Sequence, residues 1–247
     1  MALPKIIFFD AVGTLFGVRG TVGEIYAQFA QQVGLTLDAQ QLNTAFIQSF
    51  RAAPRAAFAQ ATPQDLQRLE YDWWQAVAWQ SFEAVGALKQ LPDFDAFFRP
   101  LFTYFETADP WILYPETLKV LNQLKTLEIE LAIISNFDSR LYAVLDAFEL
   151  GHWFQSVTIS TQVGAAKPEA EIFEAAIAKH QYRPSQAWHV GDSWAEDYEG
   201  SVAAGLQGIW LNRDGAKLST SSLAADSIAA LEISDLTTLK MILQGQD

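Results

Sequence analysis

Short, unbroken apolar runs recur along the chain and are separated by segments of helical length. Runs of this kind are typical of strands buried on both faces of a parallel sheet. Five such strands are predicted, at 6–9, 131–134, 156–159, 187–190 and 208–211. Helices are predicted at 115–127, 138–147, 169–180 and 194–204. This alternation predicts an α/β protein with a doubly wound, Rossmann-like parallel sheet. A weaker sixth strand is predicted at 228–231, with a last helix near 235–243.

Residues 17–108 follow a different pattern. Apolar side chains recur there at helical spacing, as in Ile25, Phe29 and Val33, without strand-like runs. We therefore predict an inserted all-helical cap domain of about four helices at 17–108, and an α/β core domain built from 1–16 and 109–247. Prolines 54, 63, 92 and 100 are expected to interrupt the cap helices. The polar segment 212–227 is expected to form a surface loop.

The composition excludes several classes of site and partner. The 247 residues include no cysteine, which rules out disulfides, thiolate metal sites and cysteine nucleophiles. The 29 acidic side chains against 16 basic ones give a net charge of −13, which disfavours binding to nucleic acid or anionic membranes. An anionic substrate would therefore need a bound cation or local positive charge. The chain has no membrane-spanning apolar run and no signal-peptide pattern, so a cytoplasmic protein is expected.

Four clusters of polar residues lie close to the carboxyl ends of the predicted strands, at 10–15, 135–136, 167–168 and 191–197. In open α/β sheets, ligands bind outside the carboxyl ends of the strands. Clusters that are far apart in sequence should therefore converge on a single site.

Each cluster also has a plain structural explanation when taken alone. Asp10 can begin a turn, Ser135 and Asn136 can cap a helix, and Lys167 can be solvated. However, a carboxylate directly after four apolar residues needs a compensating partner. A lysine at a helix N-terminus opposes the helix dipole, which indicates pairing with a carboxylate or an anion. Asp192 and Asp197 offer the oxygen ligands that suit Mg²⁺.

In order and spacing, these clusters resemble the four motifs of the haloacid dehalogenase-like hydrolases, in the branch with a helical cap between the first two motifs. Residues 10–15 (DAVGTL) are similar to the first motif, Ser135-Asn136 to the second, Lys167-Pro168 to the third, and Gly191-Asp192 with Asp197 to the fourth. The resemblance covers nearly the whole chain, and it implies a hydrolase with a Rossmann-like core and a cap.

The resemblance also implies roles for individual residues. Asp10 would be the nucleophile that forms a covalent aspartyl intermediate. Mg²⁺ would be held by Asp10, the backbone carbonyl of Val12 and Asp192, with Asp197 nearby. Ser135, with Asn136, would bind the oxygens of the transferring group, and Lys167 would stabilise their charge. Thr14 and Arg19 are further candidates for contacts with a small phosphorylated substrate. His189, inside a predicted strand, is interpreted as structural.

One position departs from the phosphatase pattern. Two residues after the nucleophile, phosphatases of this family carry a second Asp as general acid and base, whereas this chain has Val12. Three hypotheses follow. The first is a Mg²⁺-dependent phosphohydrolase that favours leaving groups needing little protonation. The second is a metal-independent 2-haloacid dehalogenase. The third is a non-catalytic relative that binds a phosphorylated ligand or a protein.

Overall fold

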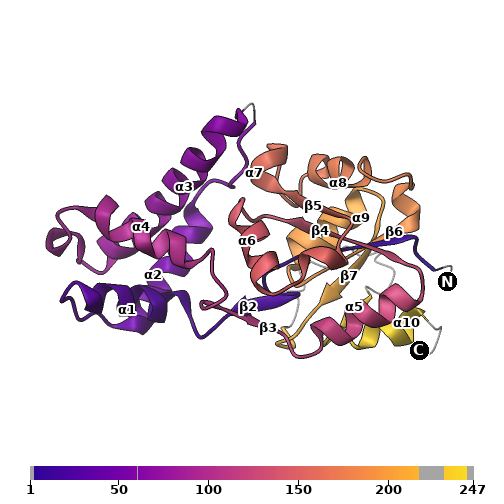
Figure 1. Ribbon diagram of the computed structural model, residues 1–247, viewed down its shortest axis with the longest axis horizontal. Helices are drawn as coiled ribbons and strands as arrows, with labels where there is room; N and C mark the ends of the chain where they lie inside the picture. The colour runs from indigo at the N-terminus through magenta and orange to yellow at the C-terminus, as the bar shows by residue number, and fades with distance from the viewer. Residues whose placement is uncertain (1–2, 60, 217–230, 244–247) are drawn as a thin grey trace.

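The computed structural model describes residues 3–59, 61–216 and 231–243. Most of the predicted surface loop, from 217 to 227, lies outside the described residues, as do 228–230 of the predicted sixth strand. Within the described part, the molecule has a helical lobe and a lobe built around a sheet (Figure 1). None of the described helices is long and apolar enough to cross a lipid bilayer.

A six-stranded, all-parallel sheet forms the centre of the larger lobe and confirms the predicted fold class. Its spatial order is β5-β4-β1-β6-β7-β8. The strands are β1 Ile6–Phe9, β4 Glu130–Ser135, β5 Ser156–Ile159, β6 Ala187–Gly191, β7 Gln207–Leu211 and β8 Glu232–Ile233. The connections run to opposite sides of β1, so the strand order reverses between β1 and β6. Such a switch point leaves a crevice at the carboxyl ends of the strands, where ligands bind.

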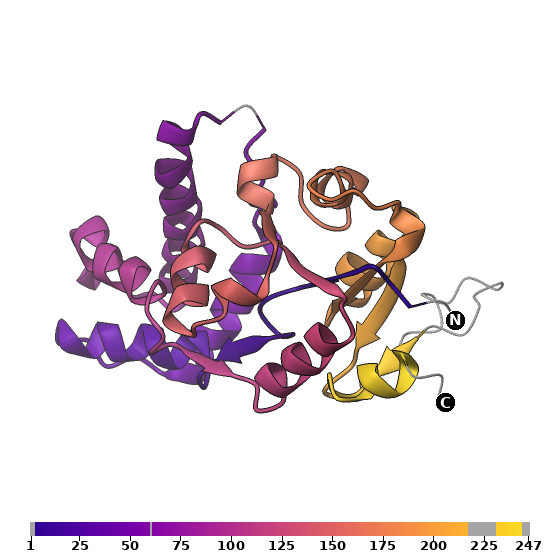
Figure 2. The ribbon, with the colours of Figure 1, turned by 45° about the vertical axis from the view of Figure 1, so that its right-hand side comes forward.

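Helices cover both faces of the sheet, as Figure 2 shows. They are α5 Thr117–Thr126, α6 Arg140–Ala147, α7 Ser160–Val163, α8 Ala170–Ile177, α9 Gly200–Ala203 and α10 Thr238–Leu243. Because side chains alternate along β1, Ile7 and Phe9 join one apolar cluster with α5, α6 and α10, whereas Ile6 and Phe8 join another with α8. The predicted helix at 194–204 is a π-helical turn, Trp194–Glu199, that continues into α9.

The smaller lobe consists of α1 Val22–Gln32, α2 Ala39–Ala52, α3 Pro63–Ala84 and α4 Phe94–Tyr104. A polar side chain caps the N-terminus of each, from Thr21, Asp38, Thr62 and Asp93. These helices share an apolar core of their own, to which aromatic side chains such as Phe82, Phe94 and Phe98 contribute. An antiparallel ribbon of β2 Phe16–Val18 and β3 Trp111–Leu113, which the sequence analysis did not predict, joins the two lobes.

The expectation that Pro100 interrupts a cap helix is wrong. Pro100 lies inside α4, on the exposed side of that helix. It cannot donate a hydrogen bond to the carbonyl four residues earlier, but on this side water can satisfy that carbonyl. Pro54 and Pro92 do lie between cap helices, and Pro63 starts α3.

The buried carboxylate of Glu70 links cap helix α3 to the core. It accepts hydrogen bonds from the Ser139 amide at 3.0 Å, the Ser139 hydroxyl at 2.9 Å and the Thr161 hydroxyl at 2.6 Å. A second link lies one turn further along α3, where the Trp74 indole donates to Asp138. The cap therefore rests directly over the carboxyl ends of β4 and β5.

Burial raises the pKa of Glu70, and Asp138 adds to the shift, although the Thr161 and Ser139 hydrogen bonds oppose it. Because the folded-state pKa of Glu70 is raised, ionisation of this carboxyl group lowers the stability of the fold as the pH rises. We expect Glu70→Gln to be at least as stable as the wild type at pH 8, with its advantage shrinking toward acid pH. Glu70→Ala should lose about 1–3 kcal/mol, because it leaves buried donors unpaired. Thermal unfolding of both variants against pH tests this; a Gln variant clearly less stable at pH 8 would contradict it.

Candidate active site

The carboxyl ends of β1 and β6, on either side of the switch point, carry two of the predicted site residues. Asp10 directly follows β1, and Asp192 directly follows β6. Gly13 makes their approach possible: its φ is +91°, and a Cβ at this position would lie 2.5 Å from the Asp192 carboxylate. The loop after β1 is held from the other side by Arg213, which donates to the carbonyls of Gly13 and Thr14.

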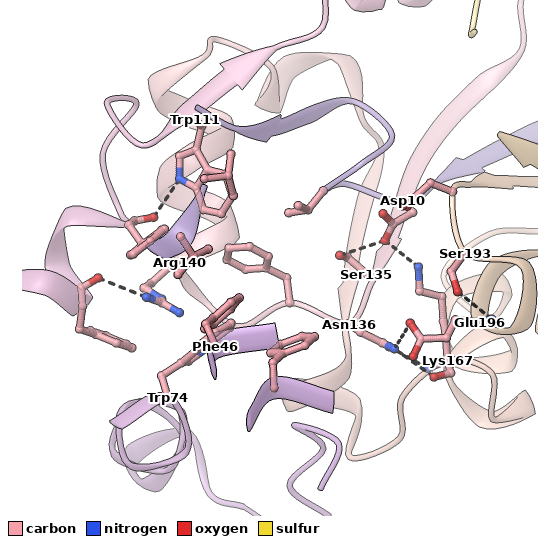
Figure 3. Close-up of a pocket in the computed structure, with 18 of the residues that line it drawn as sticks. Asp10, Phe46, Trp74, Trp111, Ser135, Asn136, Arg140, Lys167, Ser193 and Glu196 are labelled. Atoms are coloured by element: carbon pink, nitrogen blue, oxygen red, sulfur yellow. Dashed lines mark hydrogen bonds and ion pairs between the residues drawn. The ribbon is translucent and has the colours of Figure 1, made fainter. Parts of the chain in front are cut away.

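A buried ammonium group connects two of the carboxylates. The Nζ of Lys167 lies 2.6 Å from Oδ1 of Asp10 and 2.5 Å from Oδ1 of Asp197. The Ser135 hydroxyl, at the end of β4, lies 3.3 Å from the same Asp10 oxygen. Four of the predicted residues, from four separate segments, therefore meet at one point, as Figure 3 shows for three of them.

The surroundings set the charge of each group. Lys167 is almost fully buried, which opposes its charge, but Asp10 and Asp197 more than compensate and hold the Lys167 pKa above its usual range. Burial would raise the pKa of Asp197, yet Lys167 and His189 hold it well below the usual range. Lys167 and Asp197 thus form a charged pair inside the protein.

Asp10 and Asp192 are shifted in the opposite direction. Burial raises the pKa of Asp10, despite the opposing effect of Lys167. Asp192 keeps contact with solvent, but the surrounding protein removes part of the hydration of its carboxylate; together with the negative charges of Asp10 and Asp197, this raises its pKa to about 7. These two carboxylates repel each other, and a nearby cation would relieve that repulsion.

Three carboxylates form a group that could hold a metal ion. Oxygens of Asp10, Asp192 and Asp197 lie within 4.8 Å of one another. However, Asp197 Oδ1 already accepts from Lys167 and His189, and its Oδ2 accepts from the Ser193 amide at 2.9 Å. Asp10 and Asp192 are therefore the carboxylates with oxygens left for direct coordination.

Asn136 positions Lys167. Its side-chain oxygen accepts from the Lys167 amide at 2.7 Å, and its side-chain nitrogen donates to the Lys167 carbonyl at 3.0 Å. The same nitrogen also donates to Glu196 at 3.2 Å. The amide group of Asn136 is thus engaged with the protein, and Ser135 is the better placed of the two to meet a substrate.

A cavity of about 340 Å³ lies between the two lobes and reaches this cluster. The core end of the cavity is lined by Asp10, Ser135, Lys167 and Asp192, together with Val12. Its other walls are largely apolar and come mainly from the cap. The cavity therefore has a charged end on the sheet and an apolar end under the cap (Figure 3).

The structure does not bring two of the predicted substrate contacts into this cavity. The Arg19 guanidinium donates to the carbonyls of Asp109 and Trp111, where it fastens the junction between the lobes. Thr14 is part of the loop after β1 and is fully buried. Neither residue lines the cavity.

Sequence reasoning missed several residues of the site. His189 is fully buried inside β6, which agrees with a structural role, but its contact with Asp197 was not predicted: the Nε2 atom lies 2.9 Å from Asp197, and burial lowers the pKa of the ring. Glu196 lies beside Asn136 and lines the cavity. Two features of the sequence could have indicated these contacts. His189 lies eight residues before Asp197, and Glu196 directly precedes Asp197. The hydrogen bond from Arg140 to the Phe102 carbonyl, in contrast, depends on how α6 meets the cap.

The family model for haloacid dehalogenase-like hydrolases matches residues 4–205 of the chain. Haloacid dehalogenase-like hydrolase domain-containing protein 3 of Xenopus laevis is 31% identical over 202 residues, which are 82% of each sequence. The chain is thus similar to these proteins through the sheet, the site and the cap.

Solved structures with the same fold include enzymes of two kinds. The HAD phosphatase from Thermococcus onnurineus matches with a TM-score of 0.64 at 22% identity, over 98% of this chain and 99% of that one. L-2-haloacid dehalogenase from Xanthobacter autotrophicus matches with a TM-score of 0.70 at 17% identity, over 99% and 100%. At these identities the likeness establishes the fold and does not choose between the two reactions.

Proposed function

Because the chain belongs to the haloacid dehalogenase-like hydrolases and is therefore a hydrolase, we propose that it is a Mg²⁺-dependent phosphohydrolase whose nucleophile is Asp10. The observation that carries this proposal is the convergence of Asp10, Asp192 and Asp197 around the buried Lys167. A carboxylate nucleophile, a lysine for the phosphoryl oxygens and carboxylates for a divalent cation are the parts that phosphoryl transfer needs.

The donor set fits Mg²⁺. This ion prefers oxygen ligands and is usually bound by one or two carboxylates while it keeps several waters. Asp10 and Asp192 would hold it directly, with the Val12 carbonyl, while Asp197 acts through Lys167 or a water. When bound, the ion would neutralise charge on the phosphate and on the two carboxylates whose pKa values are raised.

The chain's own residues would perform two displacements. In the first, an Asp10 oxygen attacks phosphorus, the bond from phosphorus to the leaving oxygen breaks, that oxygen departs as its anion, and an aspartyl phosphate forms. In the second, water attacks phosphorus, the bond to Asp10 breaks, and inorganic phosphate is released with the protons of that water, which it exchanges with solvent. Lys167 and the Ser135 hydroxyl would bind phosphoryl oxygens in both steps. Asp197 and Asn136 would hold Lys167 in place, and His189 would support Asp197.

The geometry favours this reaction over the metal-independent dehalogenase hypothesis. A halide leaves without a proton and needs no cation, so that reaction gives no reason to bring Asp192 next to Asp10. Binding of a phosphate alone would not favour the Asp10 carboxylate at this position, because the two negative charges repel each other. The proposed core domain is 1–16 with 109–247, and the proposed cap domain is 17–108. In this division the cap covers the site, because cap residues form most of the apolar walls of the cavity.

A screen of phosphate monoesters and acyl phosphates with Mg²⁺ tests the proposed function. We expect Mg²⁺-dependent release of phosphate, lost with EDTA and restored by excess Mg²⁺. Release of chloride from 2-chloropropionate that EDTA does not affect would instead support the dehalogenase. If neither product appears and a phosphorylated ligand still binds, the non-catalytic hypothesis replaces the proposal.

Val12→Asp should raise the activity toward alkyl phosphates. Val12 lines the charged end of the cavity, where it has no proton for the leaving oxygen. General acid catalysis is typically worth 10²–10⁴-fold, and a newly introduced group should recover roughly 10- to 100-fold of it. The matched control is Val12→Asn, which has the same shape but no acid. An equal gain in both variants, or a gain in neither, would contradict the proposed role of this position.

A further inference from the structure

The apolar end of the cavity has a composition that bears on the substrate. Phe46 and Phe50 from α2, Trp74 from α3 and Phe102 from α4 line it, together with Trp111 and Phe137 from the core. Several of these rings contact one another, with Phe50 stacked on Trp74 at 5.8 Å between ring centroids. Figure 3 shows Phe46, Trp74 and Trp111 on the opposite side of the cavity from Asp10 and Lys167.

Arg140, the charged residue at the apolar end of the cavity, already has a carboxylate partner. The Arg140 guanidinium pairs with Asp138 through two bonds of 2.9 Å and 2.6 Å, and donates to the Phe102 carbonyl at 3.2 Å. It lies 3.9 Å from the centre of the Phe102 ring and 5.1 Å from that of Trp74. The Trp74 indole nitrogen is likewise engaged with Asp138. A sugar or nucleotide would have to bury its hydroxyl groups here against ring faces, whereas an apolar group would not.

The chemistry of the leaving group also favours a substrate with an aromatic group. Val12, which lines the cavity beside Asp10, has no proton to donate. A departing aliphatic alcohol needs such a proton, because it is a poor leaving group as an alkoxide. A phenol, with a pKa near 10, departs far more readily as its anion. Two independent features, the aromatic walls and the missing acid, therefore select the same leaving group.

We propose that the substrate is a phosphate monoester of an aromatic alcohol, with an uncharged ring system held among the cap aromatics and the phosphate at Asp10. This proposal rests on the phosphohydrolase function proposed above. The volume of about 340 Å³ is at the lower end of ligand pockets, which suits a phosphate with one or two rings and not a long chain.

Four probes separate the contributions of ring and leaving group. They are 2-naphthyl phosphate, n-octyl phosphate, glucose 6-phosphate and acetyl phosphate, each with Mg²⁺. We expect kcat/KM for 2-naphthyl phosphate to exceed that for octyl and glucose phosphates by roughly 100-fold or more, the size of the missing acid's contribution. Acetyl phosphate has no ring and a good leaving group, so it reports the phosphohydrolase function alone.

A pair of cap variants tests the site of ring binding. Phe50 and Trp79 are both aromatic, both on cap helices and both 44% exposed, but only Phe50 lines the cavity. Phe50→Ala should lower the ratio of kcat/KM for 2-naphthyl phosphate to that for acetyl phosphate by roughly 3- to 10-fold. Trp79→Ala should leave this ratio unchanged.

The outcomes distinguish the two proposals. If acetyl phosphate is hydrolysed but 2-naphthyl phosphate is not preferred over octyl phosphate and glucose 6-phosphate, the proposal of an aromatic substrate is wrong and the phosphohydrolase function stands. The same conclusion follows if Phe50→Ala and Trp79→Ala change the ratio of kcat/KM values equally. Octyl phosphate equal to 2-naphthyl phosphate also overturns the aromatic substrate. No phosphate release from any probe overturns the phosphohydrolase and the aromatic substrate together.

Discussion

Asp10→Asn is expected to lower Mg²⁺-dependent phosphate release by at least about 10⁴-fold, the scale seen when a nucleophile is removed. An amide oxygen is a poor nucleophile, and the substitution also removes one negative ligand of the cation. Steady-state phosphate release with acetyl phosphate or an aryl phosphate measures the loss.

The fold of this variant should stay intact, which separates chemistry from stability. The pKa of Asp10 is raised by burial, so its charge opposes folding, and Asn removes that charge. Lys167 keeps Asp197 as a partner at 2.5 Å. Thermal unfolding should therefore show an unchanged or higher Tm. Asp72→Asn, on the exposed face of α3, is the matched control and should retain full activity. Activity within tenfold of the wild type in Asp10→Asn would mean that Asp10 is not the nucleophile.

Lys167→Met is expected to reduce both activity and stability. Loss of a cation that stabilises a transferring phosphoryl group is worth about 10³–10⁵-fold in rate. The substitution also leaves Asp10 and Asp197 buried without their shared partner, and breaking a buried ion pair in this way destabilises a protein by about 3–5 kcal/mol. Phosphate release and chemical denaturation measure the two effects separately.

The pH dependence of the Lys167→Met variant follows from the same contacts. Without the ammonium group, the folded-state pKa of Asp197 should rise, and that of Asp10, which burial already raises, should rise further. The stability deficit should therefore be smallest in acid, where both carboxylates are protonated, and should grow as pH rises. Lys179→Met is the control, since Lys179 is exposed and donates to Val157 and Thr158 away from the site. A Lys167 variant as stable as wild type at pH 8 would contradict the buried charged pair.

The parts of the fold that follow from local pattern could be predicted from the sequence. Continuous apolar runs identified five strands to within a residue at either end, because each is buried on both faces of the sheet. The weak strand was expected at 228–231, but β8 is Glu232–Ile233. The ribbon of β2 and β3 was missed, because three-residue strands carry too little pattern to be recognised.

The residues that meet at the site could be predicted for a similar reason. Carboxyl ends of parallel strands share one edge, so Asp10, Ser135 and Asp192 were expected to converge. What could not be predicted depends on the docking of the cap on the core. The Glu70, Trp74 and Arg140 contacts, and the aromatic end of the cavity, join segments whose relative position no periodicity encodes.

The central claim is that phosphorus is transferred to Asp10, and trapping this intermediate tests it most directly. An aryl phosphate and Mg²⁺ are mixed with the enzyme in a single turnover, quenched in acid, and the peptide containing Asp10 is examined by mass spectrometry. We expect a phosphoryl group on Asp10 that decays as phosphate appears and that is absent from Asp10→Asn. Phosphate release with an unmodified Asp10 at every time point, or a phosphoryl group on another residue, would contradict it.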